Sequence, residues 1–306
     1  MESMHSHPVS GQRLFWTIVL NALITLAEFV AGMISGYLAL TADAVHNLSD
    51  VAALILAWLG VKGSQLPATK RSTYGYKRIE VMTAFISAVA LVVIAVFIIW
   101  EAYQRYLNPQ PISYPGLFIT VALIGLAANL LSVVLLHREK DKSLNLKTAF
   151  LHMAYDTLSS VVVLIGGVLI LYTGWTMIDP ILSAAIAVMI FWSSYLVIRE
   201  AVAILMEATP AGVGFDSVHR VIHGIPGVKN VHDLHIWSLS SYETALSCHV
   251  CLEQSDLTSG PGVVAEISRL MRENFGIGHC TVQIECEECD RSSLLCGPNG
   301  EPAKHS

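Results

Sequence analysis

Four long stretches of this chain contain no Asp, Glu, Lys or Arg, and they constrain its fold more than any other feature. Each is close to or above the ~18 residues at which an apolar run is read as a membrane-spanning helix. Two further apolar stretches, 14–36 and 38–61, are interrupted by only a few acidic or histidine side chains. The four uncharged stretches are 81–100, 115–137, 157–178 and 180–198.

The composition agrees with a membrane protein that carries a smaller soluble part. Of the 306 residues, 54% are hydrophobic and only 14% are charged, and the mean hydropathy is +0.57. Soluble domains average roughly 25% charged residues. The net charge of −6 argues against a basic nucleic-acid-binding surface. We therefore expect membrane lipid, and no nucleic acid, among the partners.

The apolar stretches predict an all-α transmembrane bundle of six helices. We place them at about 14–36, 38–61, 80–103, 115–136, 148–172 and 178–198. The loops at 62–78 and 137–147 carry most of the basic loop residues, so the positive-inside rule puts them in the cytoplasm. Both termini are then cytoplasmic.

In the last third of the chain, polar and apolar residues are patterned as in a small soluble domain. Helical spacing is found at 215–223 and 262–275, and strand-like alternation at 228–239, 245–252 and 280–285. The order α-β-β-α-β predicts a small α+β domain of ferredoxin-like type. We thus divide the chain into a disordered N-terminus (1–12), a transmembrane domain (13–200), a cytosolic domain (201–290) and a disordered tail (291–306).

Titratable side chains inside the predicted spans form two matched pairs. The second span contains His46 and Asp50, and the fifth contains His152 and Asp156, both with the spacing H-x-x-x-D. Side chains four residues apart lie on one face of a helix. Two such helices facing each other would bring together two imidazoles and two carboxylates, which can bind Zn²⁺ tetrahedrally. The carboxylates would balance the charge of the cation, so the pattern predicts an intramembrane metal site.

A buried His or Asp can also serve as a hydrogen-bond partner between helices. Two identical pairs in separate spans favour the metal site. A charged side chain inside a membrane is energetically costly, so its presence there indicates a function. Two other acidic residues have two readings each. Asp43 could support a metal ligand or line the metal path, or it could cap the second helix. Glu28 could guide cations or hydrogen-bond to Asn side chains.

The six spans, the paired motifs and the C-terminal α/β domain together resemble the cation diffusion facilitator family, in its zinc-transporting branch. The resemblance covers nearly the whole chain and includes the segments SGYLALTADAVHNLSD, LNLKTAFLHMAYDTLSS and PGVKNVHDLHIWSL. It implies a homodimer that exports zinc from the cytoplasm in exchange for protons. Cadmium and cobalt share the coordination chemistry of zinc. The resemblance also implies that the transport-site ligands are His46, Asp50, His152 and Asp156.

Proton exchange is consistent with the ligand types. The unperturbed pKa of His is near 6.5, and metal binding requires deprotonated ligands, so acid weakens metal affinity. A site that opens alternately to two sides would capture metal at neutral pH and release it on an acidic side.

The resemblance implies a second metal site in the cytosolic domain, where zinc would be structural or regulatory. Its ligand set would be His232, His249 and Glu285; solvated surface histidines are the alternative. Strand alternation predicts that His232 and Asp233 face opposite sides of their strand. Cys286 and Cys289 form a C-x-x-C, which is half of a zinc site or a pair of reduced thiols.

Two other functional classes share part of this chemistry. An intramembrane metalloenzyme would keep one open position at zinc, whereas four ligands fill the predicted site and no H-E-x-x-H motif accompanies it. We therefore expect no enzyme activity. A membrane-anchored metal sensor would signal through the cytosolic domain. Short cytosolic loops without a long His-rich segment favour a bacterial inner membrane.

Overall fold

The computed structural model describes residues 11–64, 66–137, 144–252 and 259–285. Within these ranges, some side chains of α1, α2, α4 and α5 are outside the description, including those of Asp50 and His152. The disordered ends predicted at 1–12 and 291–306 lie almost entirely outside the described residues, as do Cys286 and Cys289.

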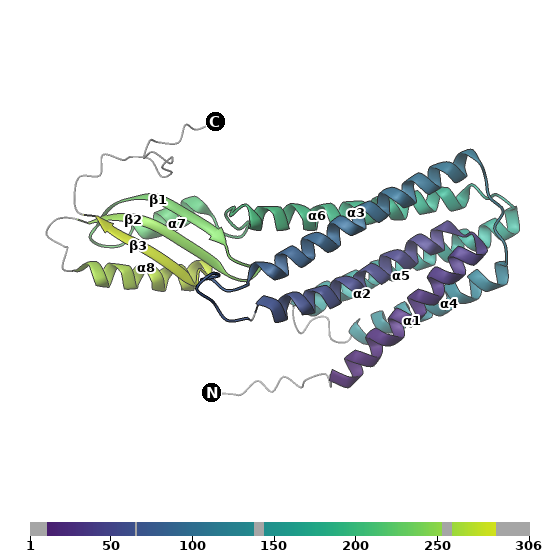
Figure 1. Ribbon diagram of the computed structural model, residues 1–306, viewed down its shortest axis with the longest axis horizontal. Helices are drawn as coiled ribbons and strands as arrows, with labels where there is room; N and C mark the ends of the chain where they lie inside the picture. Colours follow the sequence, from purple (N-terminus) through teal and green to yellow (C-terminus); the bar gives the residue numbers. More distant parts are fainter. Residues whose placement is uncertain (1–10, 65, 138–143, 253–258, 286–306) are drawn as a thin grey trace. The chain divides into compact units, whose positions relative to one another are not determined.

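A helix is found at each of the six positions predicted from apolar length (Figure 1). Several of these helices extend beyond the predicted ends, because good helix formers such as Arg199, Glu200 and Ala201 continue a helix outside the apolar stretch. The helices are α1 (Gly11–Ser35), α2 (Leu38–Ser64), α3 (Arg78–Leu107), α4 (Pro115–His137), α5 (Leu144–Thr173) and α6 (Ile178–Leu205).

Three helical segments in the described part are long and apolar enough to cross a membrane. They are α3, α6 and the Ala154–Thr173 part of α5. Shorter apolar segments, Ala22–Ser35 and Pro115–Leu131, lie in α1 and α4. The helical character of all six segments is therefore confirmed, and membrane crossing is supported for three of them.

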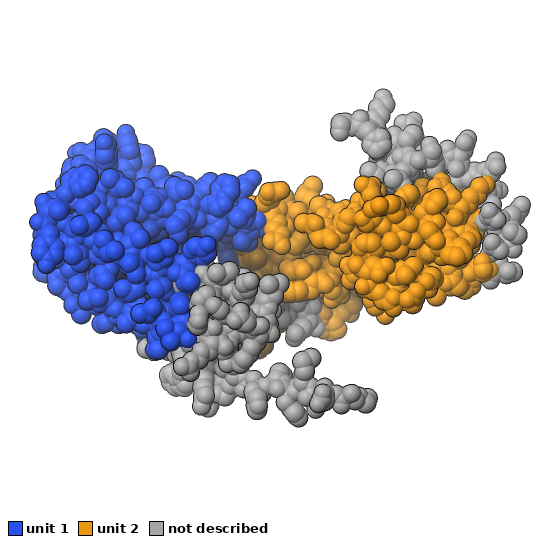
Figure 2. All heavy atoms as spheres, turned by 180° about the vertical axis from the view of Figure 1, so that it is seen from behind, with its two compact units in different colours: residues 1–56, 86–197 blue, residues 57–85, 198–306 orange. Residues whose placement is uncertain are grey.

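The chain forms two compact units, which Figure 2 colours separately. Unit 1 comprises residues 1–56 and 86–197, and its core is built mainly from small and aliphatic side chains, together with Tyr37 and Phe118. Tyr37 is fully buried, donates a hydrogen bond to the backbone oxygen of Val163 (2.6 Å) and packs against Phe118. Gly167 makes room for that ring, since an added Cβ would lie 2.6 Å from Phe118 Cε2.

Unit 2 comprises residues 57–85 and 198–306 and contains a three-stranded sheet. The predicted order α-β-β-α-β is confirmed. The sheet order is β1-β2-β3, with β1 antiparallel and β3 parallel to the central strand β2. The elements are α7 (Phe215–His223), β1 (Val228–Ser238), β2 (Thr244–Leu252), α8 (Gly260–Phe275) and β3 (His279–Glu285).

Both helices of this domain cover the same face of the sheet. The helix α7 packs beside β1, α8 packs beside β3, and the two helices contact each other. Their apolar residues, such as Ile222 and Ile267, share one core with Val231, Leu246 and Val250 of the strands. The opposite face of the sheet is therefore left for polar side chains.

Candidate metal sites

The structure brings His46 of α2 and Asp156 of α5 together inside unit 1. His46 Nε2 lies 3.5 Å from Asp156 Oδ1, and only 16% and 14% of these side chains are exposed. An imidazole and a carboxylate that face each other across two helices can contribute two ligands to one cation. Asp50 and His152 lie on the same two helices, but their side chains are outside the described set.

Asp43 joins the same two helices next to this pair. Its side chain is 1% exposed and accepts hydrogen bonds from the Ser159 (2.6 Å) and Ser160 (3.0 Å) hydroxyls of α5. Asp43 stands in the second turn of α2, so the capping interpretation is wrong. The contacts favour a supporting role, because they fix α2 against α5 beside Asp156.

The N-terminus of α2 is bound by a carboxylate from a distant part of the chain. Asp179, at the start of α6, accepts hydrogen bonds from the backbone N–H groups of Leu38 (3.1 Å) and Ala39 (2.7 Å). The Arg105 guanidinium lies 3.3 Å from the same carboxylate and also donates to the backbone oxygen of Gly36. An anion at a helix N-terminus is favourable. The sequence analysis did not predict this cap. The signal for it in the sequence is Asp179, an acidic residue at the start of an otherwise apolar span.

Glu28 is buried in the first helix, with 2% of its surface exposed. It faces Gly125 of α4, where an added Cβ would overlap the Glu28 carboxylate. The glycine therefore provides the space that this side chain occupies. Whether Glu28 also guides cations stays a prediction.

Three ligand side chains converge in the sheet domain. His232, His249 and Glu285 each offer one ligand atom, and these atoms lie within 4.8 Å of one another. Glu285 links the two imidazoles, since its Oε2 is 3.2 Å from His232 Nε2 and its Oε1 is 2.8 Å from His249 Nδ1. Among the described residues, this is the one group of three or more His, Cys, Asp or Glu with such spacing.

Strand register explains the convergence. His232 on β1 pairs directly with His249 on β2, and Glu285 on β3 pairs with Cys251, two residues beyond His249. Directly opposite and diagonal neighbours on one face of a sheet are within side-chain reach. Their strand neighbours Val231 and Val250 point to the helices, so the three ligands lie on the face without helices.

The prediction that His232 and Asp233 face opposite sides of β1 is wrong. The register shifts between His232 and His235, where two residues of β1 oppose one residue of β2. Asp233 adopts a left-handed backbone conformation there (φ 49°), and its Oδ2 lies 3.5 Å from His249 Nε2. A β-bulge of this kind re-aims a side chain. The sequence contained a signal of this bulge. Val231 and Leu234 are both apolar but are three residues apart, and simple alternation cannot place two such residues on one face of a strand.

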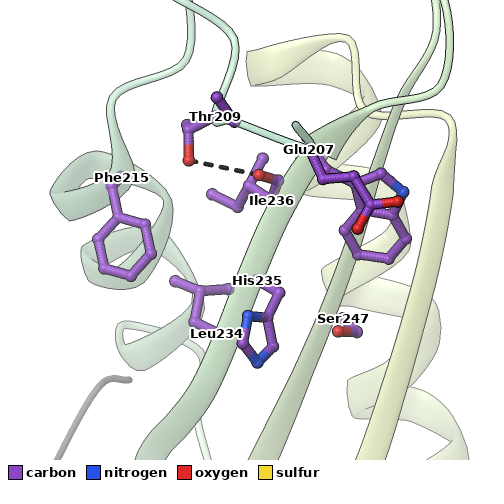
Figure 3. Close-up of a pocket in the computed structure, with 9 residues that line it drawn as sticks. Glu207, Thr209, Phe215, Leu234, His235, Ile236 and Ser247 are labelled. Atoms are coloured by element: carbon purple, nitrogen blue, oxygen red, sulfur yellow. Dashed lines mark hydrogen bonds between the residues drawn. The ribbon is translucent and has the colours of Figure 1, made fainter. Parts of the chain in front are cut away.

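A separate hollow lies at the other end of β1, next to the end of α6 (Figure 3). The Thr209 hydroxyl donates a hydrogen bond to the backbone oxygen of Ile236 across it (3.3 Å). His235 borders the hollow, and half of its side chain is exposed. The apolar part of the wall includes Phe215 and Leu234. This hollow does not contain the three-residue ligand group.

Comparison with known proteins gives a family match for each of the two parts of the chain. The family model described as the cation efflux transmembrane domain matches residues 14–206. The model described as the cation efflux protein cytoplasmic domain matches residues 210–287.

Full-length relatives match over nearly the whole chain. The zinc transporter ZitB of Shigella flexneri is 35% identical and covers 100% of this chain and 99% of its own length. The metal cation efflux system protein CzcD of Cupriavidus metallidurans is 34% identical (98% and 94%). The cadmium, cobalt and zinc/H(+)-K(+) antiporter of Bacillus subtilis is also 34% identical (97% and 96%).

Among solved structures, the metal-bound C-terminal domain of the CzcD transporter from Cupriavidus metallidurans is 36% identical. It covers 24% of this chain and 99% of its own, with a TM-score of 0.23. The two family models and the full-length identities are sufficient to assign the chain. It belongs to the cation efflux family, also called the cation diffusion facilitator family, in the zinc branch, and is a membrane transporter rather than an enzyme.

Proposed function

We propose that this protein exports Zn²⁺ from the cytoplasm in exchange for protons, by exposing one intramembrane site alternately to the two sides of the membrane. Cd²⁺ and Co²⁺ are further substrates on this proposal, because they share the coordination chemistry of zinc. The substrate ion would be held by two imidazoles and two carboxylates, contributed by His46, Asp50, His152 and Asp156.

The approach of His46 to Asp156 carries this proposal. Their facing atoms are 3.5 Å apart and come from the two helices that bear the H-x-x-x-D pairs. Charged and titratable groups inside a membrane domain mark ion pathways by default. A zinc ion needs His in its neutral form, so loading the site releases protons and acid favours unloading.

The names of the relatives support this substrate class. They include a zinc transporter, a metal cation efflux protein and an antiporter of cadmium, cobalt and zinc against H⁺ and K⁺. The last name raises K⁺ as a second counter-ion, which the experiment below has to separate from protons.

We further infer six membrane spans with both termini in the cytoplasm, a transmembrane domain over 13–200 and a cytosolic domain over 201–290. The match of residues 210–287 to a cytoplasmic domain supports this orientation. Bacterial relatives favour the inner membrane of a bacterium. The family resemblance supports a homodimer.

We also propose that His232, His249 and Glu285 bind a resident zinc ion with a structural or regulatory role. Two imidazoles and a carboxylate are ligands that suit zinc. The Nδ1 atom of His249 is buried and lies 2.8 Å from Glu285 Oε1, but within the described part of the chain it makes no hydrogen bond of normal geometry to this or any other group. A buried imidazole nitrogen in this state fits a lone pair directed at a cation. When bound, the ion would join β1, β2 and β3 through their side chains.

A flux experiment tests the transport proposal. The purified protein is reconstituted into liposomes that contain a zinc-sensitive dye, and pH and K⁺ gradients are imposed separately. We expect zinc flux that follows the pH gradient and is lost in His46→Ala and Asp156→Ala. The matched controls are His223→Ala and Asp216→Ala, which remove the same residue types from α7 and should leave flux unchanged.

Flux in His46→Ala or Asp156→Ala equal to that of the wild type would contradict the assigned site. Flux that follows the K⁺ gradient alone would overturn proton coupling while leaving export intact. A folded wild-type protein that binds zinc without any flux would favour a metal sensor instead.

A further inference from the structure

We propose that Glu28 of α1 carries one of the protons that the transporter exchanges for zinc. Its carboxyl group holds a proton while the membrane site is empty and releases it when zinc binds between α2 and α5. This inference rests on the proposed proton-coupled export and deepens it. Glu28 is not one of the proposed zinc ligands, so its link to the metal is electrostatic.

Glu28 is a buried carboxyl group without a stabilising partner. Only 2% of its surface is exposed, and among the residues that the structure describes it forms no hydrogen bond and no ion pair. Burying an unpaired carboxylate is so costly that such a group takes up a proton and becomes neutral instead. Glu28 is therefore a carboxylic acid in the zinc-free protein. A purely structural side chain could fill the same space without this cost.

The neighbouring helices surround Glu28 with few titratable groups. The helix α4 lies beside α1 and places Gly125 against the carboxyl group (Figure 1). The one titratable residue in the sequence of α4 is His137, at its last position. The other titratable residue of α1 is Arg13, which is ~22 Å away along the helix axis. The charged side chain that acts on Glu28 is Asp43 of α2, and two carboxylates repel each other.

The two carboxyl groups lie in different environments. Asp43 accepts hydrogen bonds from the Ser159 and Ser160 hydroxyls, and such donors favour the ionised form. Glu28 has no such donor within the described part of the chain, and the negative charge of Asp43 disfavours a second one. Where the environments of two interacting carboxyl groups differ in this way, one holds the charge and the other holds the proton. Here Glu28 holds the proton.

Zinc binding reverses this balance. Asp43 interacts electrostatically with His46 and Asp156, so the membrane site and Glu28 both lie within range of one carboxylate. A divalent cation at the membrane site adds positive charge beside Asp43 and offsets the repulsion that keeps Glu28 protonated. The O–H bond of Glu28 then breaks and its proton passes to water. When zinc leaves, Glu28 takes up a proton from water again.

The first test counts the protons that are released when zinc binds to the full-length protein in detergent. Zinc is added at pH 7 in weak buffer that contains a pH indicator. Glu28→Gln keeps the shape of the side chain but has no proton to lose, so it should release about one proton per zinc fewer than the wild type. Protons released at the cytosolic site are the same in both proteins and cancel in the difference. The matched control is Glu101→Gln, which changes an exposed carboxylate of α3 and should behave like the wild type.

A second comparison locates the origin of the released proton. In an Asp156→Ala background, zinc still binds to the cytosolic domain but no longer binds beside Asp43. Glu28→Gln should then make no difference to the number of protons released. In liposomes, Glu28→Gln should retain the exchange of zinc for zinc without a pH gradient, whereas zinc flux driven by a pH gradient should fall. Thermal unfolding in detergent checks that the variant folds like the wild type.

The outcomes separate this inference from the proposed function. Equal proton release from Glu28→Gln and the wild type would overturn the role of Glu28 and leave proton-coupled export intact. A difference that persists in the Asp156→Ala background would overturn the link between Glu28 and the membrane site. Loss of zinc-for-zinc exchange in folded Glu28→Gln would overturn the proton role in favour of a direct role in the metal path. Wild-type zinc flux that ignores the pH gradient would overturn proton coupling itself.

Discussion

Asp43 illustrates how a buried polar side chain can set the geometry of its neighbours. Removing the carboxylate in Asp43→Ala takes away the acceptor on α2 for the Ser159 and Ser160 hydroxyls, and leaves Ser159 only its bond to the backbone oxygen of Asp156. Polar contacts between membrane helices average ~0.6 kcal/mol and reach ~1.7 kcal/mol. We expect a stability loss in that range, measured by thermal unfolding in detergent, with zinc flux reduced more strongly than stability. Normal flux in a destabilised variant would contradict a supporting role at the metal site.

Cys248 is expected to be chemically inert in the folded protein. Burial, and secondarily the nearby Cys280, raises the pKa of the Cys248 thiol to about 12. Only the thiolate reacts with alkylating agents, so at pH 8 roughly one molecule in ten thousand is reactive at this site. Iodoacetamide at pH 8 should label Cys248 only after denaturation, and raising the pH should increase native labelling. Peptide mass spectrometry before and after denaturation checks this, and rapid native labelling would contradict it.

The residues of the candidate sites were predictable to different degrees. The H-x-x-x-D pairs stand out because a charge inside an apolar stretch is visible in the sequence itself. The supporting residues were harder to assign. Asp233 reaches His249 only because β1 contains a bulge, and the role of Asp43 depends on a neighbouring helix that is more than a hundred residues away. Spacing along one element cannot show what a second element places beside it.

The helices were predictable because apolar length is a local property. The sequence gives no such local signal for how α2 is anchored. Its first backbone N–H groups are bound by Asp179 of α6, about 140 positions along the chain.

The cap of α2 can be tested by removing its acceptor. Asp179→Ala removes the acceptor for the Leu38 and Ala39 N–H groups and leaves Arg105 without this carboxylate. Loss of a helix cap typically costs about 0.5–2 kcal/mol. We expect lower thermal stability and faster hydrogen exchange at the start of α2. Glu101→Ala, which removes the exposed carboxylate partner of Arg105, is the control and should leave exchange at Leu38 and Ala39 unchanged.

Packing of α1 against α4 gives a second test. In Gly125→Ala, the new methyl group would overlap the buried Glu28 carboxylate, whereas in Gly116→Ala it would meet no atom within 4 Å. Overpacking typically costs about 1–3 kcal/mol. We expect Gly125→Ala to lower the unfolding temperature and Gly116→Ala, on the same helix, to leave it nearly unchanged. Adding Glu28→Ala should restore part of the loss, and a failure to do so would place the strain elsewhere.

Two ion pairs join the start of α3 to the domain that follows α6. Arg78 Nη2 lies 2.8 Å from Glu207 Oε1, and Lys77 pairs with Glu243. Glu207 stands between the segments matched by the two family models, which end at 206 and begin at 210. Both pairs lie within unit 2, so they hold together segments that are far apart in the sequence.

A charge swap measures what the Arg78–Glu207 pair contributes. The two side chains are 38% and 62% exposed, and such surface pairs contribute at most about 1 kcal/mol. Arg78→Glu and Glu207→Arg should each lower the unfolding temperature slightly by placing like charges together, and the double variant should recover the loss. At 1 M salt, where the Debye length is ~3 Å, the differences should vanish. If the single variants lose zinc flux beyond their stability loss and the double variant recovers it, the pair couples the domain to transport. Equal losses in the single and double variants would contradict a direct pairing.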